Sequence, residues 1–172
     1  MSYRVVIPTA GIGSRLGDLT EYINKSLVSI SCRPTLSHLI EQFPADCEFV
    51  IALGHKGNLI REFVEIAYSH RRFYFADVDP YVGPGSGLGH SLLCCEKYLR
   101  LPFIFVSCDT LVKETIPPPE HDWIGYAETT DTYSYRTISV NQNIATGIFE
   151  KGSKNVEHTH AYICLLYTSD AV

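Results

Sequence analysis

Short apolar runs alternate with amphipathic stretches over the first 110 residues of the chain. Apolar, β-branched runs predict buried strands at residues 4–9, 47–53, 72–78 and 102–107. Apolar residues at helical spacing predict intervening helices at residues 34–43, 56–69 and 88–99. Such alternation of strands and helices predicts a parallel sheet with helices on both faces.

The helical spacing also predicts which side chains face the core. For the first two helices the inward residues are Leu36, Leu39, Ile40 and Phe43, then Leu59, Phe63, Ile66 and Ala67. For the third they are Leu92, Cys95 and Leu99.

A different pattern follows the three prolines at 117–119. Shorter strand-like runs occur at 123–128, 134–140 and 143–149, and another at 161–164. They predict a mixed or antiparallel C-terminal extension. We therefore expect a Rossmann-like three-layer α/β/α fold with a mostly parallel central sheet, forming a single domain over residues 1–172.

The composition is that of a globular protein, with 45% hydrophobic and 19% charged residues. The net charge of −5 argues against a nucleic-acid-binding surface. No apolar run approaches the ~18 residues of a membrane span, and no basic stretch leads into an apolar core at the N-terminus. We expect a cytoplasmic protein without nucleic-acid or membrane partners.

The cysteine and histidine patterns give little sign of a structural metal site. The six cysteines contain no CxxC pair, which favours reduced, mostly buried thiols. His158 and His160 form an HxH pair, but it lacks a recognisable third ligand.

Three unusual segments fall at the carboxyl ends of predicted strands, where ligands bind in open α/β sheets. One is the loop Ala10, Gly11, Ile12, Gly13, Ser14 and Arg15, whose glycines let backbone N–H groups approach a phosphate. The second is the loop containing Gly83, Gly85, Ser86 and Gly87, and the third is Asp109. Leu16 stands where a dinucleotide fingerprint needs glycine, so the first loop by itself is compatible with a mere tight turn.

Lys25 makes the interpretation of the first loop more specific. The order strand, GxGxR ending at Arg15, about nine residues and then K-x-L-x-x-I from Lys25 resembles the signature of the sugar-phosphate nucleotidylyltransferases. The chain departs from that signature at Asn24, where the family commonly has proline, and in the looser segment 17–20. Three later features match in order: the 85–87 loop, Asp109 after a strand, and Ile148-Phe149-Glu150-Lys151, which resembles a hydrophobic–E–K motif.

The resemblance implies a transfer of NMP from an NTP to a phosphorylated small molecule, with release of pyrophosphate. Arg15 and the 10–14 backbone would hold the departing phosphates, and Lys25 would stabilise charge on the α-phosphate. Asp109 would hold Mg²⁺, the implied cofactor, while Glu150 and Lys151 would bind the acceptor. The 83–87 loop would lie against the base and ribose.

The substrates are less well specified than the reaction. The acceptor is expected to be a sugar phosphate or a related molecule such as an amino-alcohol phosphate. CTP is slightly favoured as the nucleotide, because the short loop and small chain resemble compact cytidylyltransferase-type members. A homodimer is the default expectation, since dimers are common among proteins of the family that the chain resembles.

Relatives with this motif order are usually longer, with a second metal-binding aspartate beyond the EK motif. The last seven or so residues do not read as a natural continuation, so we expect a chain truncated at its C-terminus. Asp170 is a conceivable second carboxylate, although its surroundings give no support.

Other functions compete with this hypothesis. The chain is compatible with a nucleotide-binding regulatory module that has lost turnover, or with a molybdenum-cofactor nucleotidyltransferase, although the EK motif speaks against the latter. Asp77-Val78-Asp79 fits the DxD pattern of a glycosyltransferase using a nucleotide-sugar, an alternative that leaves Arg15 and Lys25 unexplained.

Overall fold

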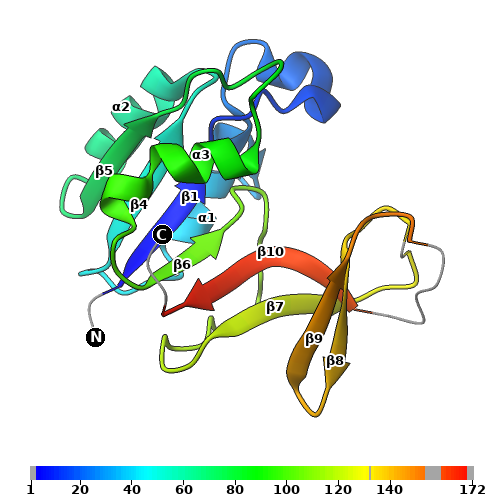
Figure 1. Ribbon diagram of the computed structural model, residues 1–172. Coiled ribbons are helices and arrows are strands. Elements are labelled where there is room, and N and C mark those ends of the chain that lie inside the picture. Colours follow the sequence, from blue (N-terminus) through cyan, green and yellow to red (C-terminus); the bar gives the residue numbers. More distant parts are fainter. Residues whose placement is uncertain (1–2, 132, 154–159, 170–172) are drawn as a thin grey trace.

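The computed structural model describes residues 3–131, 133–153 and 160–169, which form a large mixed sheet flanked by helices (Figure 1). Within these residues the main sheet has eight strands, in the order β5-β4-β1-β6-β10-β8-β9 with β7 paired to β10. A separate two-stranded ribbon joins β2 (Ser29–Ile30) to β3 (Arg33–Pro34).

Four parallel strands form the N-terminal half of the sheet: β1 (Arg4–Pro8), β4 (Glu48–Leu53), β5 (Arg72–Asp77) and β6 (Phe103–Val106). Their interior residues are almost entirely apolar, and those of β1, β4 and β6 are buried. Runs buried on both faces are typical of parallel strands covered by helices. The sequence prediction for this half is confirmed.

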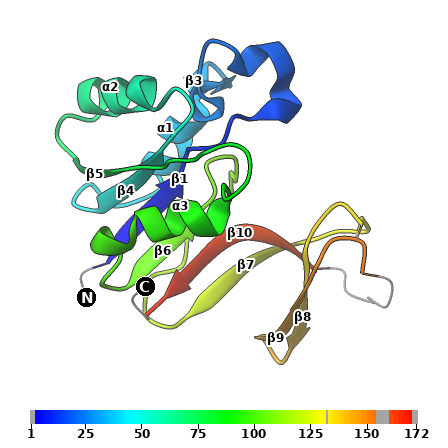
Figure 2. The ribbon, with the colours of Figure 1, turned by 45° about the horizontal axis from the view of Figure 1, so that its top comes forward.

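Helices cover both faces of the parallel strands. The α-helices are α1 (Thr35–Ile40), α2 (Gly57–Ala67) and α3 (Leu88–Cys94), and the short 3-10 turns are η1 (Ser14–Thr20), η2 (Lys25–Leu27) and η3 (Glu96–Tyr98). Apolar residues of α1 and α2 pack with Val5 and Ile7 of β1, whereas the α3 region packs with Val6 from the opposite face. The layers are visible in Figure 2, and they confirm the expected α/β/α arrangement.

Antiparallel strands complete the sheet, as expected for the C-terminal extension. The central one is β10 (His160–Thr168), which pairs with β6, with β7 (Trp123–Glu128) and with β8 (Thr137–Asn141). The hairpin of β8 and β9 (Ile144–Phe149) projects to one side of the molecule (Figure 1). Strand β8 starts three residues later than predicted.

The inward face predicted for α2 is wrong in part, because Phe63 packs against the core but Ile66 and Ala67 do not. Ile66 is 74% exposed and Ala67 is also exposed, while Leu59 and Phe63 are only partly buried. The fully buried residues of the helix are Gly57, Ile60 and Val64. The apolar stripe of this helix is wider than one inward face, and its docking against the sheet selects Ile60 and Val64.

Two predicted helices are shorter than the periodicity suggests. The first ends at Ile40 rather than at residue 43, and the next residues tighten through i→i+3 backbone bonds from Gln42 to Leu39 and from Phe43 to Ile40. The third ends at Cys94 and continues as η3, which still buries Cys95 and Leu99 as predicted. Periodicity alone does not separate a continuous helix from a helix followed by tighter turns.

Candidate active site

The loop after β1 passes close to Lys25 at the carboxyl edge of the sheet. Gly13 has a φ of 69°, a left-handed conformation that favours glycine. A Cβ at this position would lie 3.0 Å from the side chains of both Lys25 and Thr20. Gly13 therefore allows the loop to turn and to approach Lys25 at the same point.

Most of this loop is open to solvent. Gly11, Ile12, Ser14 and Arg15 are exposed, and in the described part of the chain the Arg15 guanidinium has no hydrogen-bond or ion-pair partner. Ala10 is buried. The loop thus offers exposed backbone and a free cationic fork to an anionic ligand.

His55, two residues after the end of β4, holds this loop in place. The sequence analysis missed this role. Its backbone N–H donates to the Ala10 carbonyl at 2.9 Å, and its ring Nε2 lies 2.9 Å from the Thr20 carbonyl oxygen. The preceding Gly54 packs so closely that a Cβ there would lie 2.6 Å from the Ala10 oxygen. No pattern in the sequence marks a histidine after a strand as such a support.

Asn24 is a second positioning residue that sequence reasoning missed. Its buried amide donates to the carbonyls of Thr9 (2.8 Å) and His55 (2.6 Å) and accepts from the N–H and hydroxyl of Ser26 (both 2.9 Å). All four hydrogen-bonding positions of the amide are used. Asn24 thereby fixes the start of η2, and with it Lys25, against the end of β1. The available signal was its pattern as a helix N-cap, Asn followed by Ser two residues later.

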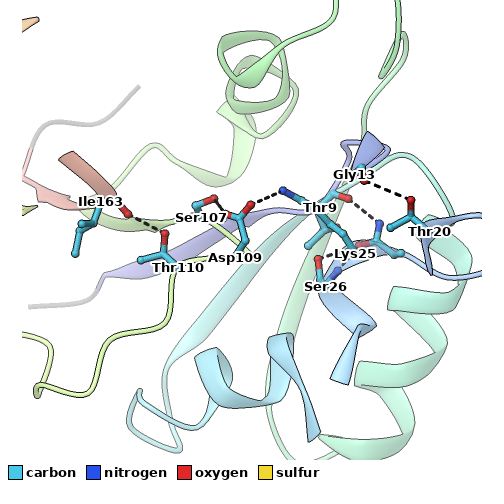
Figure 3. Close-up of polar contacts among 10 residues, drawn as sticks. Thr9, Gly13, Thr20, Lys25, Ser26, Ser107, Asp109, Thr110 and Ile163 are labelled. Carbon is cyan, nitrogen blue, oxygen red and sulfur yellow. Dashed lines mark hydrogen bonds and ion pairs between the residues drawn. The ribbon is translucent and has the colours of Figure 1, made fainter. Parts of the chain in front are cut away.

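Lys25 and Asp109 form an ion pair across the end of the sheet. Lys25 Nζ lies 2.9 Å from Asp109 Oδ2. This contact is drawn as a dashed line in Figure 3. Burial lowers the pKa of Lys25, but Cys108 and Asp109 raise it, and the balance is a raised pKa. Burial raises the pKa of Asp109, but hydrogen bonds from Ser107 and Lys25 outweigh it, so that pKa is lowered. Both groups are therefore charged at neutral pH.

The antiparallel part of the sheet holds the Asp109 turn in place. Ser107 donates from its hydroxyl to the Asp109 carboxylate and from its N–H to the Cys164 carbonyl at 3.0 Å. Thr110 donates to the Ile163 carbonyl at 2.8 Å (Figure 3). Cys164 has a φ of 56°, and the register of β10 shifts at this bulge. The bulge turns two carbonyls toward the residues that flank Asp109.

The chemistry of Asp109 fits a magnesium ion that is bound mainly by substrate phosphates. Its side chain is 64% exposed and its carboxylate is ionised. Mg²⁺ binds oxygen ligands and often takes one or two carboxylates together with phosphates and water. Over residues 3–131, 133–153 and 160–169, no group of three or more His, Cys, Asp or Glu side chains forms a metal cluster. Asp170 and His158 lie outside the described residues, whereas His160 packs edge-on against the ring of Tyr126.

The loop between β5 and α3 runs across the same end of the sheet (Figure 1). Gly83 and Gly85 have φ values of 83° and 86°, and a Cβ at Gly83 or Gly87 would meet nothing within 4 Å. The Ser86 hydroxyl donates back to the Gly83 carbonyl at 2.7 Å. The loop is a folded turn whose glycine backbone is open to an approaching ligand.

Glu150 and Lys151 follow β9. Glu150 Oε2 lies 3.1 Å from Arg136 Nε, and Lys151 is exposed. Burial raises the pKa of Cys164, Asp109 raises it further, and Arg136 and Lys151 lower it. The ion pair of Glu150 with Arg136 joins the EK motif to the residue that precedes β8. Arg136 was missed in the sequence analysis, because a single arginine in a polar segment carries no signal.

No protein-family model matches the chain. Curated relatives are nevertheless found among the nucleotidylyltransferases. The chain is 25% identical to UTP–glucose-1-phosphate uridylyltransferase of Salmonella typhimurium over 69% of this chain and 48% of that protein. It is 28% identical to a probable glucose-1-phosphate cytidylyltransferase of Bacillus subtilis over 80% of this chain and 52% of that protein. The chain thus spans about half the length of these relatives.

The solved structure of UDP-glucose pyrophosphorylase complexed with UDP-glucose has the same fold. It matches with a TM-score of 0.82 and 18% identity, covering 98% of this chain and 76% of that chain. The fold is therefore the α/β fold of nucleotidylyltransferases. More narrowly, the proteins to which the chain is similar are sugar-phosphate nucleotidylyltransferases, which confirms the resemblance found in the sequence.

Proposed function

We propose that the chain carries the nucleotide site of a Mg²⁺-dependent nucleotidylyltransferase. The enzyme transfers NMP from an NTP to a phosphorylated small molecule, a sugar phosphate or an amino-alcohol phosphate, and releases pyrophosphate. Relatives that act on glucose 1-phosphate support this class of acceptor. CTP is the nucleotide we expect first, although these two relatives differ in the nucleotide they are named for.

The ion pair of Lys25 and Asp109 is the observation that carries this proposal. It joins a cation supported by Asn24 to a carboxylate held by Ser107, beside an exposed glycine loop. A surface ion pair with no function needs neither a fully bonded buried amide beneath it nor a bulged strand beside it. The arrangement suits a reaction in which several phosphate charges meet.

Each residue then has a role in binding or charge stabilisation. Arg15 and the exposed loop backbone bind the β- and γ-phosphates, and Lys25 donates to the α-phosphate. Asp109 would hold the metal, which would supply positive charge to the phosphates when bound. Lys151 binds the acceptor phosphate.

Proton transfer has little part in this reaction. The acceptor phosphate is already ionised at neutral pH, so it attacks the α-phosphorus without a general base. The P–O bond to pyrophosphate breaks as the new P–O bond forms, and the negative charge leaves with pyrophosphate. Rate enhancement then comes from alignment and charge neutralisation.

A nucleotide panel on three proteins tests the proposal: wild type, Lys25→Ala and the matched control Lys97→Ala. Lys97 is an exposed lysine on η3, over the ring of Tyr98. One NTP with Mg²⁺ at ~100 times its dissociation constant should stabilise the wild type by about 2.7 kcal/mol. We expect Lys25→Ala, and not Lys97→Ala, to reduce this melting shift.

The preferred NTP is then supplied with glucose 1-phosphate or phosphocholine, and pyrophosphate release is measured. Loss of one preorganised charge donor should slow the transfer about 10²- to 10³-fold in Lys25→Ala. A wild type that melts cooperatively without a shift for any nucleotide would remove the proposed function. Binding without pyrophosphate release would instead favour a nucleotide-binding module without turnover.

A further inference from the structure

Arg136 lies where three strands of the C-terminal extension meet. It immediately precedes β8, whose Thr137 is opposite Phe149 of β9, so Arg136 stands across from Glu150. Its carbonyl accepts the backbone N–H of Tyr162 in β10 at 2.9 Å. The backbone of Arg136 is thus fixed by strand pairing, unlike that of a residue in a free loop.

The guanidinium of Arg136 is only partly engaged. Its Nε donates to Glu150 Oε2 at 3.1 Å, and its side chain is 48% exposed. Within the described residues, no hydrogen bond reaches its two terminal nitrogens. A guanidinium fixed through Nε presents its remaining N–H groups as a planar fork, a geometry that matches a phosphate.

This fork belongs to a cationic surface next to Asp109. The Arg136 carbonyl is hydrogen-bonded to Tyr162, and the next residue of β10, Ile163, accepts a hydrogen bond from Thr110, which follows Asp109. Arg136 therefore lies close to the bulge of β10 that supports the Asp109 turn, and Lys151 follows its ion-pair partner Glu150. Lys25, Arg136 and Lys151 carry three positive charges against two on Asp109 and Glu150, which leaves +1 among these groups. Phosphate anions are attracted to this part of a chain whose net charge is −5.

We infer that Arg136 is a further residue that binds the phosphate of the acceptor, beside Lys151, with Glu150 holding the guanidinium in its orientation. This inference rests on the proposed function, and it adds Arg136 to the residues that bind the acceptor. Glu150 is then a positioning residue, because it acts through Arg136. Lysine is not an adequate substitute at position 136, since a single ammonium cannot form two parallel bonds to a phosphate.

Direct binding of acceptor phosphates tests the assignment without requiring turnover. Glucose 1-phosphate, phosphocholine and inorganic phosphate are titrated by calorimetry into wild type, Arg136→Gln, Arg136→Lys and the control Arg100→Gln. Arg100 is an exposed arginine paired with Glu96, away from the carboxyl edge. Glucose without phosphate serves as the ligand control.

We expect at least one phosphomonoester to bind the wild type, and Arg136→Gln to weaken it about tenfold or more, as for loss of a charged hydrogen bond. Arg136→Lys should restore only part of the affinity, and Arg100→Gln should match the wild type. The melting shift with NTP and Mg²⁺ should be unchanged in all three variants. A purely structural role for Arg136 would lower the melting temperature and leave the phosphate affinity intact.

The outcomes separate the inference from the proposed function. A wild type that binds nucleotide but none of the three phosphates overturns the inference alone, as does an Arg136→Gln variant with wild-type phosphate affinity. Phosphate binding that depends on Arg136, in a protein that binds no nucleotide, supports the phosphate site and overturns the proposed transferase. Binding of glucose itself as tightly as glucose 1-phosphate also contradicts the inference.

Discussion

At the scale of single residues, the candidate site depends on a buried neutral amide as much as on its charges. Asn24 has a fully buried side chain and makes four hydrogen bonds, two of them to carbonyls on other segments. Removing a buried partner leaves these groups unsatisfied, which costs more than the bond itself contributes. The position of Lys25 therefore depends on its neighbour in sequence.

Asn24→Ala is expected to lower the free energy of unfolding by about 3 kcal/mol, because buried carbonyls at Thr9 and His55 lose their donor. Urea denaturation measures this change. The exposed Asn58→Ala serves as the control and should stay within about 0.5 kcal/mol of the wild type. Equal effects of the two substitutions would contradict the role assigned to Asn24.

Asp109→Asn should separate stability from ligand binding. The Asp109 side chain is 64% exposed, so the ion pair with Lys25 contributes no more than about 1 kcal/mol. The substitution should hardly change the melting temperature but should abolish the Mg²⁺-dependent part of the NTP shift. A Mg²⁺ effect that persists in Asp109→Asn would mean that the metal binds elsewhere.

The Asp109 carboxylate should also make the stability of the protein depend on pH, in a direction that its pKa predicts. The pKa of Asp109 is lowered in the folded protein, so its contribution is present above the ordinary carboxyl pKa and is lost as the pH falls through the folded value. The small stability difference between wild type and Asp109→Asn should therefore exist at neutral pH and disappear in acid. Denaturation curves at several pH values measure it, and a difference that grows in acid would contradict the assignment.

At the scale of elements, strands were easier to predict than helix faces. Buried parallel strands such as β4 are apolar throughout, so their assignment does not depend on which face is inward. In α2, apolar residues occur on more than one side, and the sequence pattern favoured Ile66 over Ile60. Packing against β4 and β5 decided between them, and that packing requires residues distant in sequence.

The corrected face of α2 predicts very different effects for two isoleucines of the same helix. Ile60→Ala should destabilise the protein by about 2–5 kcal/mol, because Ile60 is fully buried and its removal leaves a cavity. Ile66→Ala should change stability by less than about 0.5 kcal/mol, because that side chain is 74% exposed. Chemical denaturation of the two variants compares them directly, and a reversed order would refute the orientation of the helix.

At the scale of the whole molecule, the six cysteines are free thiols among the described residues, in agreement with the sequence prediction. Burial raises the pKa of Cys47 to about 11 and that of Cys95 to about 12. Cys32 is the exposed one. No helix within the described ranges is long and apolar enough to cross a membrane.

Thiol titration with a disulfide reagent near pH 8 should therefore show one fast reaction, at Cys32, in the folded protein. Buried thiols react slowly because they are inaccessible and protonated. All six should react after unfolding. Cys94 and Cys164 are partly buried and should react more slowly than Cys32, and Cys47, Cys95 and Cys108 more slowly still. Cys32→Ser is expected to remove the fastest phase, and a reaction equally fast in this variant would contradict the assignment.

The sequence by itself determined the parallel half of the sheet, the carboxyl-edge loops and the family resemblance. These features are encoded locally, in apolar runs, glycines and short motifs that need no distant partner to be recognised. Only the tertiary structure decided the inward face of α2, the pairing of Lys25 with Asp109 across 84 positions, and the supporting contacts of Asn24, His55 and Arg136. Those features depend on contacts between segments far apart in the chain, and no local pattern specifies which side chains such contacts bring together.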